Sequence, residues 1–215
     1  MATQSKLLSF VLICLVAAAG IAASRWWGHP APAVDLTTGS FLTPSRTLPD
    51  FNLIDQHGRA FRAVNLRGHW SLLFFGYTNC PDFCPTTLTI LAAMNKRLHA
   101  DKAQVVPQVI FVSVDAKRDT PEQLAKYVPY FDPEFIGLTA VDQPSIEAVA
   151  KKLGVAVILQ PAADGSYTVD HSGAIFVLNP DGRLTAILTG PFSVGALLSD
   201  FQRIVAARGL FAGST

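Results

Sequence analysis

Charged residues are scarce in this chain: Asp, Glu, Lys and Arg make up 15% of its 215 residues, against about 25% in a typical soluble domain. Neither sign dominates, since 17 Lys and Arg face 16 Asp and Glu. Without a basic face or stripe, the composition offers no electrostatic basis for binding nucleic acid. Half of the residues are hydrophobic, so the chain is not of the disordered class and can bury a core. Its length suits one domain or at most two small ones.

Cysteine is also scarce, with only Cys14, Cys80 and Cys84 in the sequence. Three cysteines are too few for a small scaffold stapled by disulfides. Cys14 lies inside an apolar run, where we expect it to have no chemistry. Any cysteine chemistry is therefore predicted to belong to Cys80 and Cys84.

The apolar run Leu7–Ala23 holds no charged residue and lies between Lys6 and Arg25. A cleaved signal peptide has a basic start and a small-residue cleavage site, which residues 22–24 (Ala-Ala-Ser) would supply. A membrane anchor needs about 17–25 apolar residues and favours aromatic residues at its interface, which residues 26–27 (Trp-Trp) would supply. The anchor is the favoured interpretation, and either one sends the rest of the chain across a membrane.

The first 24 residues contain no Arg, which argues against a mitochondrial transit peptide. We therefore expect a bacterial inner-membrane protein with a single pass and a soluble domain that faces the periplasm. Without residues 1–27 the chain keeps 15 basic and 16 acidic residues, a net charge of about −1. It also keeps just two cysteines, Cys80 and Cys84, in an oxidising compartment.

Residues 28–47 are rich in Pro, Gly, Ser and Thr and are predicted to be a linker that holds the domain off the membrane. Strand and helix signals alternate from about residue 48 to residue 209, and residues 48–212 are predicted to form one domain. The predicted strands are Phe51–Ile54, Ala60–Arg62, Trp70–Phe75, Val105–Val114, Val155–Leu159, Tyr167–Asp170, Ala174–Leu178 and Leu184–Leu188. The predicted helices are Pro85–His99, Thr120–Tyr130, Ser145–Leu153 and Val194–Ala207. This order predicts an α/β domain with a central mixed sheet flanked by helices, as in the thioredoxin fold.

Cys80 and Cys84 lie between the predicted strand Trp70–Phe75 and the helix expected to begin at Pro85. A helix N-terminus lowers the pKa of a thiol, because its unpaired N–H groups and its dipole favour the thiolate. Thiolates are both nucleophiles and soft metal ligands, so the pair could hold a metal ion or form a disulfide. A purely structural disulfide would close a very short loop and add little stability. The Cys-x-x-x-Cys spacing is one residue longer than in thioredoxin, which weakens the interpretation as an ordinary oxidoreductase.

Two thiolates leave a soft metal site open, and a histidine is a candidate for the third ligand. His171 stands at the entry to an apolar strand, and its neighbour Asp170 could orient its ring or tune the charge around it. From the residues alone, His171 is either a ligand or an ordinary, partly buried histidine. The remaining histidines are expected to be solvated: His29, His57, His69 and His99.

Several segments together have a distinctive pattern, because a Cys-x-x-x-Cys motif is combined with a distant Asp-His pair. The segments are Phe75–Leu88, Val112–Asp115, Arg118–Pro121, Phe135–Thr139 and Asp170–Ser172. Over most of the exported domain they resemble the Sco/SenC family of copper-binding assembly proteins. The chain departs from that family at Ala116 and Lys117, where Pro and Glu are frequent.

This resemblance implies a thioredoxin-like fold, facing outward from a membrane anchor, in which Cys80, Cys84 and His171 bind copper as Cu(I) or Cu(II). It also implies delivery of copper to the dinuclear centre of cytochrome c oxidase, or reduction of that centre's cysteines. The partner would be the copper-receiving subunit of the oxidase or another copper chaperone. Two Cys and one His suit soft Cu(I) better than structural zinc, which usually has four ligands.

Three rival functions remain open. A thiol–disulfide oxidoreductase would use Cys80 and Cys84 as its redox-active pair and would not need His171. A peroxide-reducing thiol enzyme would need a peroxidatic cysteine. A redox or copper sensor would use the same reversible site as a copper chaperone. For Asp115, Arg118 and Asp119, a strand end followed by a helix cap is the expected role.

Overall fold

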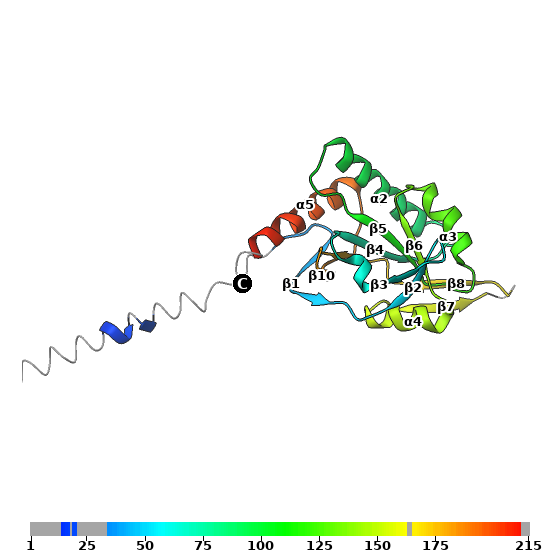
Figure 1. Cartoon of the computed structure of the whole chain (residues 1–215), viewed down its shortest axis with the longest axis horizontal. Coiled ribbons are helices and arrows are strands. Elements are labelled where there is room, and N and C mark those ends of the chain that lie inside the picture. Colours follow the sequence, from blue (N-terminus) through cyan, green and yellow to red (C-terminus); the bar gives the residue numbers. More distant parts are fainter. Residues whose placement is uncertain (1–13, 18, 21–33, 163–164, 212–215) are drawn as a thin grey trace, which may run out of the picture. The chain divides into compact units, whose positions relative to one another are not determined.

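Figure 1 shows a computed structural model of the chain, which describes residues 14–17, 19–20, 34–162 and 165–211. The chain divides into two units, Met1–Ala33 and Val34–Thr215. The strands are β1 (Gly39–Thr47), β2 (Asn52–Asp55), β3 (Ala60–Arg62), β4 (Ser71–Gly76), β5 (Gln108–Ser113), β6 (Ile136–Thr139), β7 (Val157–Pro161), β8 (Tyr167–His171), β9 (Ile175–Leu178) and β10 (Arg183–Leu188). The helices are α2 (Phe83–Ala100), α3 (Pro121–Tyr127), α4 (Gln143–Lys152) and α5 (Val194–Phe211), with short 3-10 helices η1 (Ala63–Leu66) and η2 (Val128–Tyr130).

The second unit is built on an eight-stranded sheet with the order β1-β10-β9-β4-β5-β6-β2-β3. The three strands β4, β5 and β6 run parallel, whereas β9, β10 and β2 pair antiparallel with their neighbours. Every residue of β4 is buried, as expected for a central strand that is covered on both faces. The prediction of a central mixed sheet flanked by helices is confirmed.

Each face of the sheet has its own hydrophobic core. Successive side chains of a strand point to opposite faces, so Phe74 lies in one core and Phe75 in the other. The Phe74 core contains the apolar sides of α2, α3 and α5. The Phe75 core contains residues of η1, α4 and β8. Gly76, the residue at the end of β4, leads directly into the segment that carries the cysteines.

Two strands occur where no strand is predicted. β1 lies within the predicted linker, residues 28–47, and pairs antiparallel with β10 at the edge of the sheet. Its Pro44 is compatible with an edge position, where not every N–H needs a partner, and the pairing shifts register between Phe41 and Arg46. β6 has only four residues, and its Gly137 interrupts the apolar pattern. The end of the predicted linker is therefore part of the sheet.

Asp200 on α5 fixes the start of the second unit. Its fully buried carboxylate accepts hydrogen bonds from the backbone N–H of Thr37 at 2.9 Å and of Thr38 at 2.7 Å. The Thr38 hydroxyl donates a third, also at 2.7 Å. These hydrogen bonds outweigh the effect of burial and hold the pKa of Asp200 below its usual value. The backbone just before β1 is therefore held against α5.

The predicted membrane anchor or signal segment, residues 1–27, lies mostly outside the described residues. Residues 14–17 and 19–20 are helical, and Cys14 is exposed. In the part of the chain that the structure describes, no helix is both long enough and apolar enough to cross a membrane.

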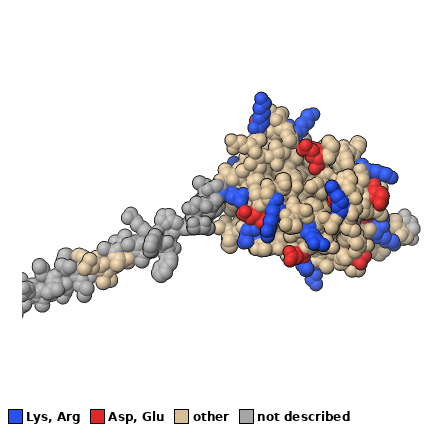
Figure 2. Space-filling view, in the orientation of Figure 1, with Lys and Arg blue, Asp and Glu red and all other residues tan. Residues whose placement is uncertain are grey.

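Charged side chains of both signs are interspersed over the face of the second unit that Figure 2 shows. This pattern agrees with the near balance of basic and acidic residues in the sequence. The visible face therefore has no basic stripe of the kind that nucleic-acid binding requires.

Candidate metal centre

Cys80 and Cys84 lie at the junction of β4 and α2, as predicted. The helix begins earlier than expected, at Phe83 rather than Pro85, with Asp82 at its N-cap position. Cys84 is therefore the second residue of α2, and Pro85 fits the first turn because a first-turn N–H has no partner within the helix. Both cysteines are free thiols, with Cys80 partly exposed and Cys84 buried.

His171 is brought to this junction from the end of β8. Its Nε2 lies 3.6 Å from Cys84 Sγ, and the Cys84 N–H donates to Cys80 Sγ at 3.4 Å. The three predicted ligands thus lie in one connected cluster. Within the described ranges, no group of three or more His, Cys, Asp and Glu side chains is already arranged to hold a metal ion.

The ring of His171 is oriented by its own loop. Its Nδ1 lies 3.1 Å from the carbonyl oxygen of Ser172, and a carbonyl can only accept, so Nδ1 carries the proton. In a neutral imidazole this leaves the lone pair of Nε2 facing Cys84. Of the two roles predicted for Asp170, orienting the ring falls to Ser172, and the Asp170 carboxylate accepts a hydrogen bond from Gln160 at 3.1 Å. The charge of Asp170 does act on His171, because it slightly opposes the lowering of the pKa of the ring by burial.

Burial determines the protonation of this cluster. It lowers the pKa of His171, against smaller opposing effects of the Ser172 carbonyl and Asp170. It also raises the pKa of Cys84 strongly, helped by a hydrogen bond with Cys80. The expectation that the helix N-terminus would lower the pKa is therefore wrong for Cys84, since desolvation of the thiolate outweighs the dipole. Near neutral pH His171 is neutral and Cys84 is a thiol.

Two glycines make room for the cluster. A Cβ atom on Gly76 would lie 2.9 Å from Cys84 Sγ and 2.6 Å from the ring of Phe111. A Cβ atom on Gly173 would lie 2.6 Å from the ring of Phe83, the residue just before Cys84. At Gly76 both neighbours are fully buried, so a larger residue would force them apart, whereas the Phe83 ring opposite Gly173 is partly exposed and can move.

Two aromatic rings form the wall beside His171. Its ring stands edge-on to Phe74, with centroids 6.4 Å apart, and to Tyr77, with centroids 6.0 Å apart. Burial raises the pKa of Tyr77, against smaller opposing effects of the Val169 backbone and of Arg118. Sequence reasoning did not identify Tyr77, although it immediately follows the buried strand and lies in the same short segment as Cys80.

The acidic residues after β5 are more than a strand end and a helix cap. Thr120 does cap α3, accepting from the Gln123 N–H. Asp119, however, is buried and accepts hydrogen bonds from the Thr78 N–H at 2.9 Å and the Thr78 hydroxyl at 2.6 Å. It thereby fixes the backbone two residues before Cys80. The role expected for Asp119 was too limited, because the sequence did not show that Thr78 would lie opposite it.

Among the residues that the structure describes, the other histidines do not join the cluster. His57, His69 and His99 are exposed, in agreement with the prediction. His99 lies on α2 and its nearest acidic partner is Glu134, at 3.5 Å. His29 lies outside the described residues.

Comparisons with known proteins agree on one family. The family model described as SCO1/SenC matches residues 41–206. An SCO2-like protein from Rickettsia prowazekii is 42% identical over 135 residues, and the match covers 62% of this chain and 64% of that protein. The chain thus spans just under two thirds of this relative.

Solved structures give the same result. The crystal structure of ScoI from Arabidopsis thaliana with copper bound has 32% identity and a TM-score of 0.70, over 74% of this chain and 97% of that one. BsSco, described as a Sco-family cytochrome c oxidase assembly protein with a disulfide switch, has 25% identity and a TM-score of 0.60, over 74% and 94%. The resemblance drawn from the motifs is confirmed.

Proposed function

The chain belongs to the SCO1/SenC family, and we propose that it binds one copper ion through Cys80, Cys84 and His171 and delivers it to the dinuclear copper centre of cytochrome c oxidase. The observation that carries the proposal is the approach of Cys84 Sγ to His171 Nε2, at 3.6 Å. Two thiolates and an imidazole form a donor set that suits Cu(I). The copper bound to the Arabidopsis relative supports the same cargo.

The chemistry of binding follows from the protonation of the cluster. His171 is neutral and its Nε2 lone pair is available without loss of a proton. Cys84 must lose its proton, because only the thiolate is a good ligand. Copper binding therefore releases protons, and the attraction between Cu(I) and sulfur must offset the cost of a buried thiolate.

Release of the ion would begin at the exposed side of the cluster. Cys80 is partly exposed, whereas Cys84 is buried. A ligand from the receiving subunit can therefore reach the ion beside Cys80, and Cys84 and His171 would leave later. Such stepwise ligand exchange moves the ion without freeing it into water.

The location of the site follows from the N-terminal segment. We propose that residues 1–27 anchor the protein in the bacterial inner membrane and that the residues from 28 to the start of β1 at Gly39 link this anchor to a periplasmic domain that ends near residue 212. The domain would then face the same compartment as the copper-receiving subunit of the oxidase. Labelling of the intact protein in spheroplasts with a membrane-impermeant thiol reagent tests this topology, since reaction at Cys80 requires a periplasmic location.

Anaerobic titration of the reduced protein with Cu(I) tests the binding. We expect a copper-to-protein ratio near one for the wild type and near zero for Cys80→Ser, because serine is a poor ligand for soft Cu(I). Equal ratios in the two proteins would refute the site. Transfer is tested by mixing the loaded protein with the copper-free receiving subunit and measuring copper in each after separation.

A second function rests on the same cysteines. Cys80 is accessible and its Sγ accepts a hydrogen bond from Cys84 N at 3.4 Å, so one thiol can attack a disulfide and the other can resolve the mixed disulfide. The pair would then lose two electrons and two protons, and the disulfide of the partner would become two thiols. Turnover of a disulfide substrate that is unaffected by His171→Ala would favour this function over copper delivery.

A further inference from the structure

The hairpin that carries His171 is separate from the main sheet. Strands β7 and β8 form their own two-stranded sheet, and His171 pairs with Val157 at the end of that ladder. In Figure 1 the hairpin lies at the edge of the second unit, near α4. Among the described strands, no ladder joins the hairpin to the main sheet, and the short connection from His171 to β9 tethers it there. Side-chain contacts therefore help to fix the position of His171 relative to Cys84.

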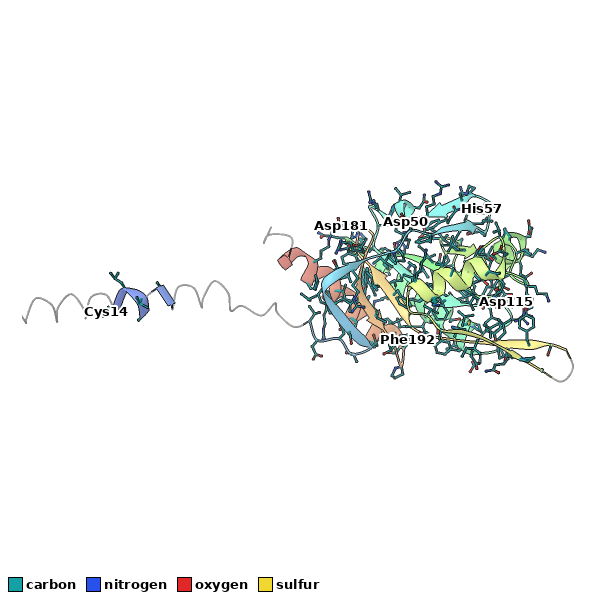
Figure 3. The ribbon with its side chains drawn as sticks, turned by 90° about the horizontal axis from the view of Figure 1, so that it is seen from below. Cys14, Asp50, His57, Asp115, Asp181 and Phe192 are labelled. Carbon is teal, nitrogen blue, oxygen red and sulfur yellow. The ribbon has the colours of Figure 1, made fainter. Side chains whose placement is uncertain are left out.

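Three side chains hold the start of β8 to the segment that follows β5, and we call Asp115, Arg118 and Tyr167 the clasp. Arg118 Nη1 donates to the carbonyl oxygen of Tyr167 at 3.0 Å, and the guanidinium carbon lies 3.8 Å from the centre of the Tyr167 ring. The Tyr167 hydroxyl donates to Asp115 Oδ1 at 2.8 Å, and Arg118 Nε donates to Asp115 Oδ2. Each member thus contacts both others. Figure 3 shows Asp115 on the side of the unit from which the hairpin projects.

The clasp is largely shielded from water. The side chain of Asp115 is fully buried and that of Arg118 is only 24% exposed. Buried charge pairs are screened much less than exposed ones. Removal of Arg118 would leave the buried carboxylate of Asp115 without its charge partner, so the ion pair favours the arrangement in which Tyr167 lies against both residues.

Arg118 also contacts the wall of the metal centre. Its guanidinium carbon lies 5.5 Å from the centre of the Tyr77 ring. Tyr77 in turn stands edge-on to the ring of His171, with centroids 6.0 Å apart. Arg118 is therefore connected to His171 along two routes, through the Tyr167 end of β8 and through Tyr77.

We propose that Arg118 is a positioning residue for copper binding: through Tyr167 and Tyr77 it holds the β7–β8 hairpin so that His171 meets Cys84. This inference rests on the proposed function, because it assigns a role in that same site. Arg118 does not itself touch the ligands. Its effect on copper affinity must therefore pass through His171.

This requirement separates positioning from general support of the fold. If Arg118 only stabilised the fold, Arg118→Ala would lower copper affinity by the same factor whether or not His171 were present. If it positions His171, the substitution should have little effect once His171 has been removed. A double-mutant cycle measures this difference directly.

The cycle uses the full-length reduced protein, Cu(I) and a competing chelator. We expect Arg118→Ala to weaken binding by about tenfold, or 1.4 kcal/mol, and by less than about threefold in the His171→Ala background. Arg59→Ala is the matched control, because Arg59 also pairs with an aspartate, Asp55, but is 73% exposed and lies in the β2–β3 turn. If Arg118→Ala does not fold, Arg118→Lys replaces it in the cycle. Lysine keeps the positive charge but lacks the planar guanidinium group that donates to both Asp115 and Tyr167.

Two measurements without metal keep this inference distinct from copper binding. Hydrogen exchange should be faster by about tenfold or more at the backbone amides of β7 and β8 in Arg118→Ala, and unchanged there in Arg59→Ala. The ring proton shifts of His171, which depend on the rings of Phe74 and Tyr77, should move in Arg118→Ala alone.

The outcomes are distinguishable. If the wild type binds no copper, the proposed function fails, and the exchange and shift measurements still decide whether Arg118 positions the hairpin. If the wild type binds copper through His171 but Arg118→Ala acts equally in both backgrounds, the positioning role is overturned. Unchanged exchange in β7 and β8 together with unchanged His171 shifts would overturn it as well.

Discussion

The close packing at Gly76 leads to the sharpest test of how the fold shapes the metal centre. In Gly76→Ala the new Cβ would lie 2.9 Å from Cys84 Sγ and 2.6 Å from Phe111 Cε2. Neither neighbour can move freely, since Cys84 and Phe111 are both fully buried. Phe111 is also flanked by Phe74 and Tyr127, with ring centroids 6.2 Å and 5.6 Å away.

The size of the effect follows from these distances. Ordinary non-bonded contacts between heavy atoms are about 3.5–4.0 Å, so Cys84 Sγ must move by roughly 0.6–1.1 Å. Functional sites tolerate displacements of about 0.5 Å. Overpacking of a buried site costs about 1–3 kcal/mol of folding free energy. We therefore expect Gly76→Ala to lower the stability by this amount and to weaken Cu(I) binding by about tenfold or more.

The control is a second glycine of the same kind. A Cβ atom on Gly137 in β6 would lie 2.9 Å from Val128 Cγ2 and 3.1 Å from Leu124 Cβ. Gly137→Ala should therefore cost similar stability by overpacking, with no change in copper affinity. Denaturant unfolding of the metal-free proteins and Cu(I) titration against a chelator measure the two quantities. If Gly76→Ala binds copper as tightly as Gly137→Ala does, the account of Gly76 as the residue that makes room for Cys84 is refuted.

Three further predictions concern protonation and packing. Because burial raises the pKa of Cys84, Cu(I) must displace the proton of this thiol. The apparent affinity for Cu(I) should therefore rise by about tenfold per pH unit for each proton released. A titration series in which the affinity does not rise between about pH 6.5 and about pH 8 would contradict this prediction. Asp200→Ala should lower the free energy of unfolding by about 2–3 kcal/mol, because it leaves the buried Thr38 N–H without its acceptor. The folded-state pKa of Asp200 is lowered from 3.8, so the stability that Asp200 contributes is present above about pH 3.8 and is lost as the pH falls below it. Identical acid unfolding of Asp200→Ala and the wild type would contradict this contribution of Asp200. Gly173→Ala should cost less than about 1 kcal/mol, because the Phe83 ring is 46% exposed and can swing outward; a loss as large as that of Gly76→Ala would show that the ring is fixed.

The central strands and the position of the cysteines were predictable because local signals determine them. The apolar run at residues 70–75 is short and is followed by Gly76, which favours a buried strand, and it ends shortly before Cys80. The helix after it followed from the periodic leucines of residues 85–99. The start of α2 was misplaced by two residues, since Pro85 is compatible with several positions of the first turn.

The features that were not predicted depend on partners distant in the sequence. β1 contains Pro44 and polar residues and is a strand only because β10 pairs with it. The pKa of Cys84 depends on burial by residues of other elements, which no local pattern reveals. Asp115 and Tyr167 are 52 residues apart, and Arg118 and Tyr167 are 49 apart. The clasp could therefore be recognised only once the hairpin had been placed in space.

The contribution of His171 to Cu(I) affinity tests the central claim most directly. The reduced wild type, His171→Ala and His57→Ala would be titrated anaerobically with Cu(I) against a competing chelator. His57 is the control because it is an exposed histidine in the β2–β3 turn. We predict one ion per wild-type molecule, affinity weakened by about tenfold or more, roughly 1.4 kcal/mol, in His171→Ala, and no change in His57→Ala. Equal affinity in all three proteins would contradict a copper site built from Cys80, Cys84 and His171.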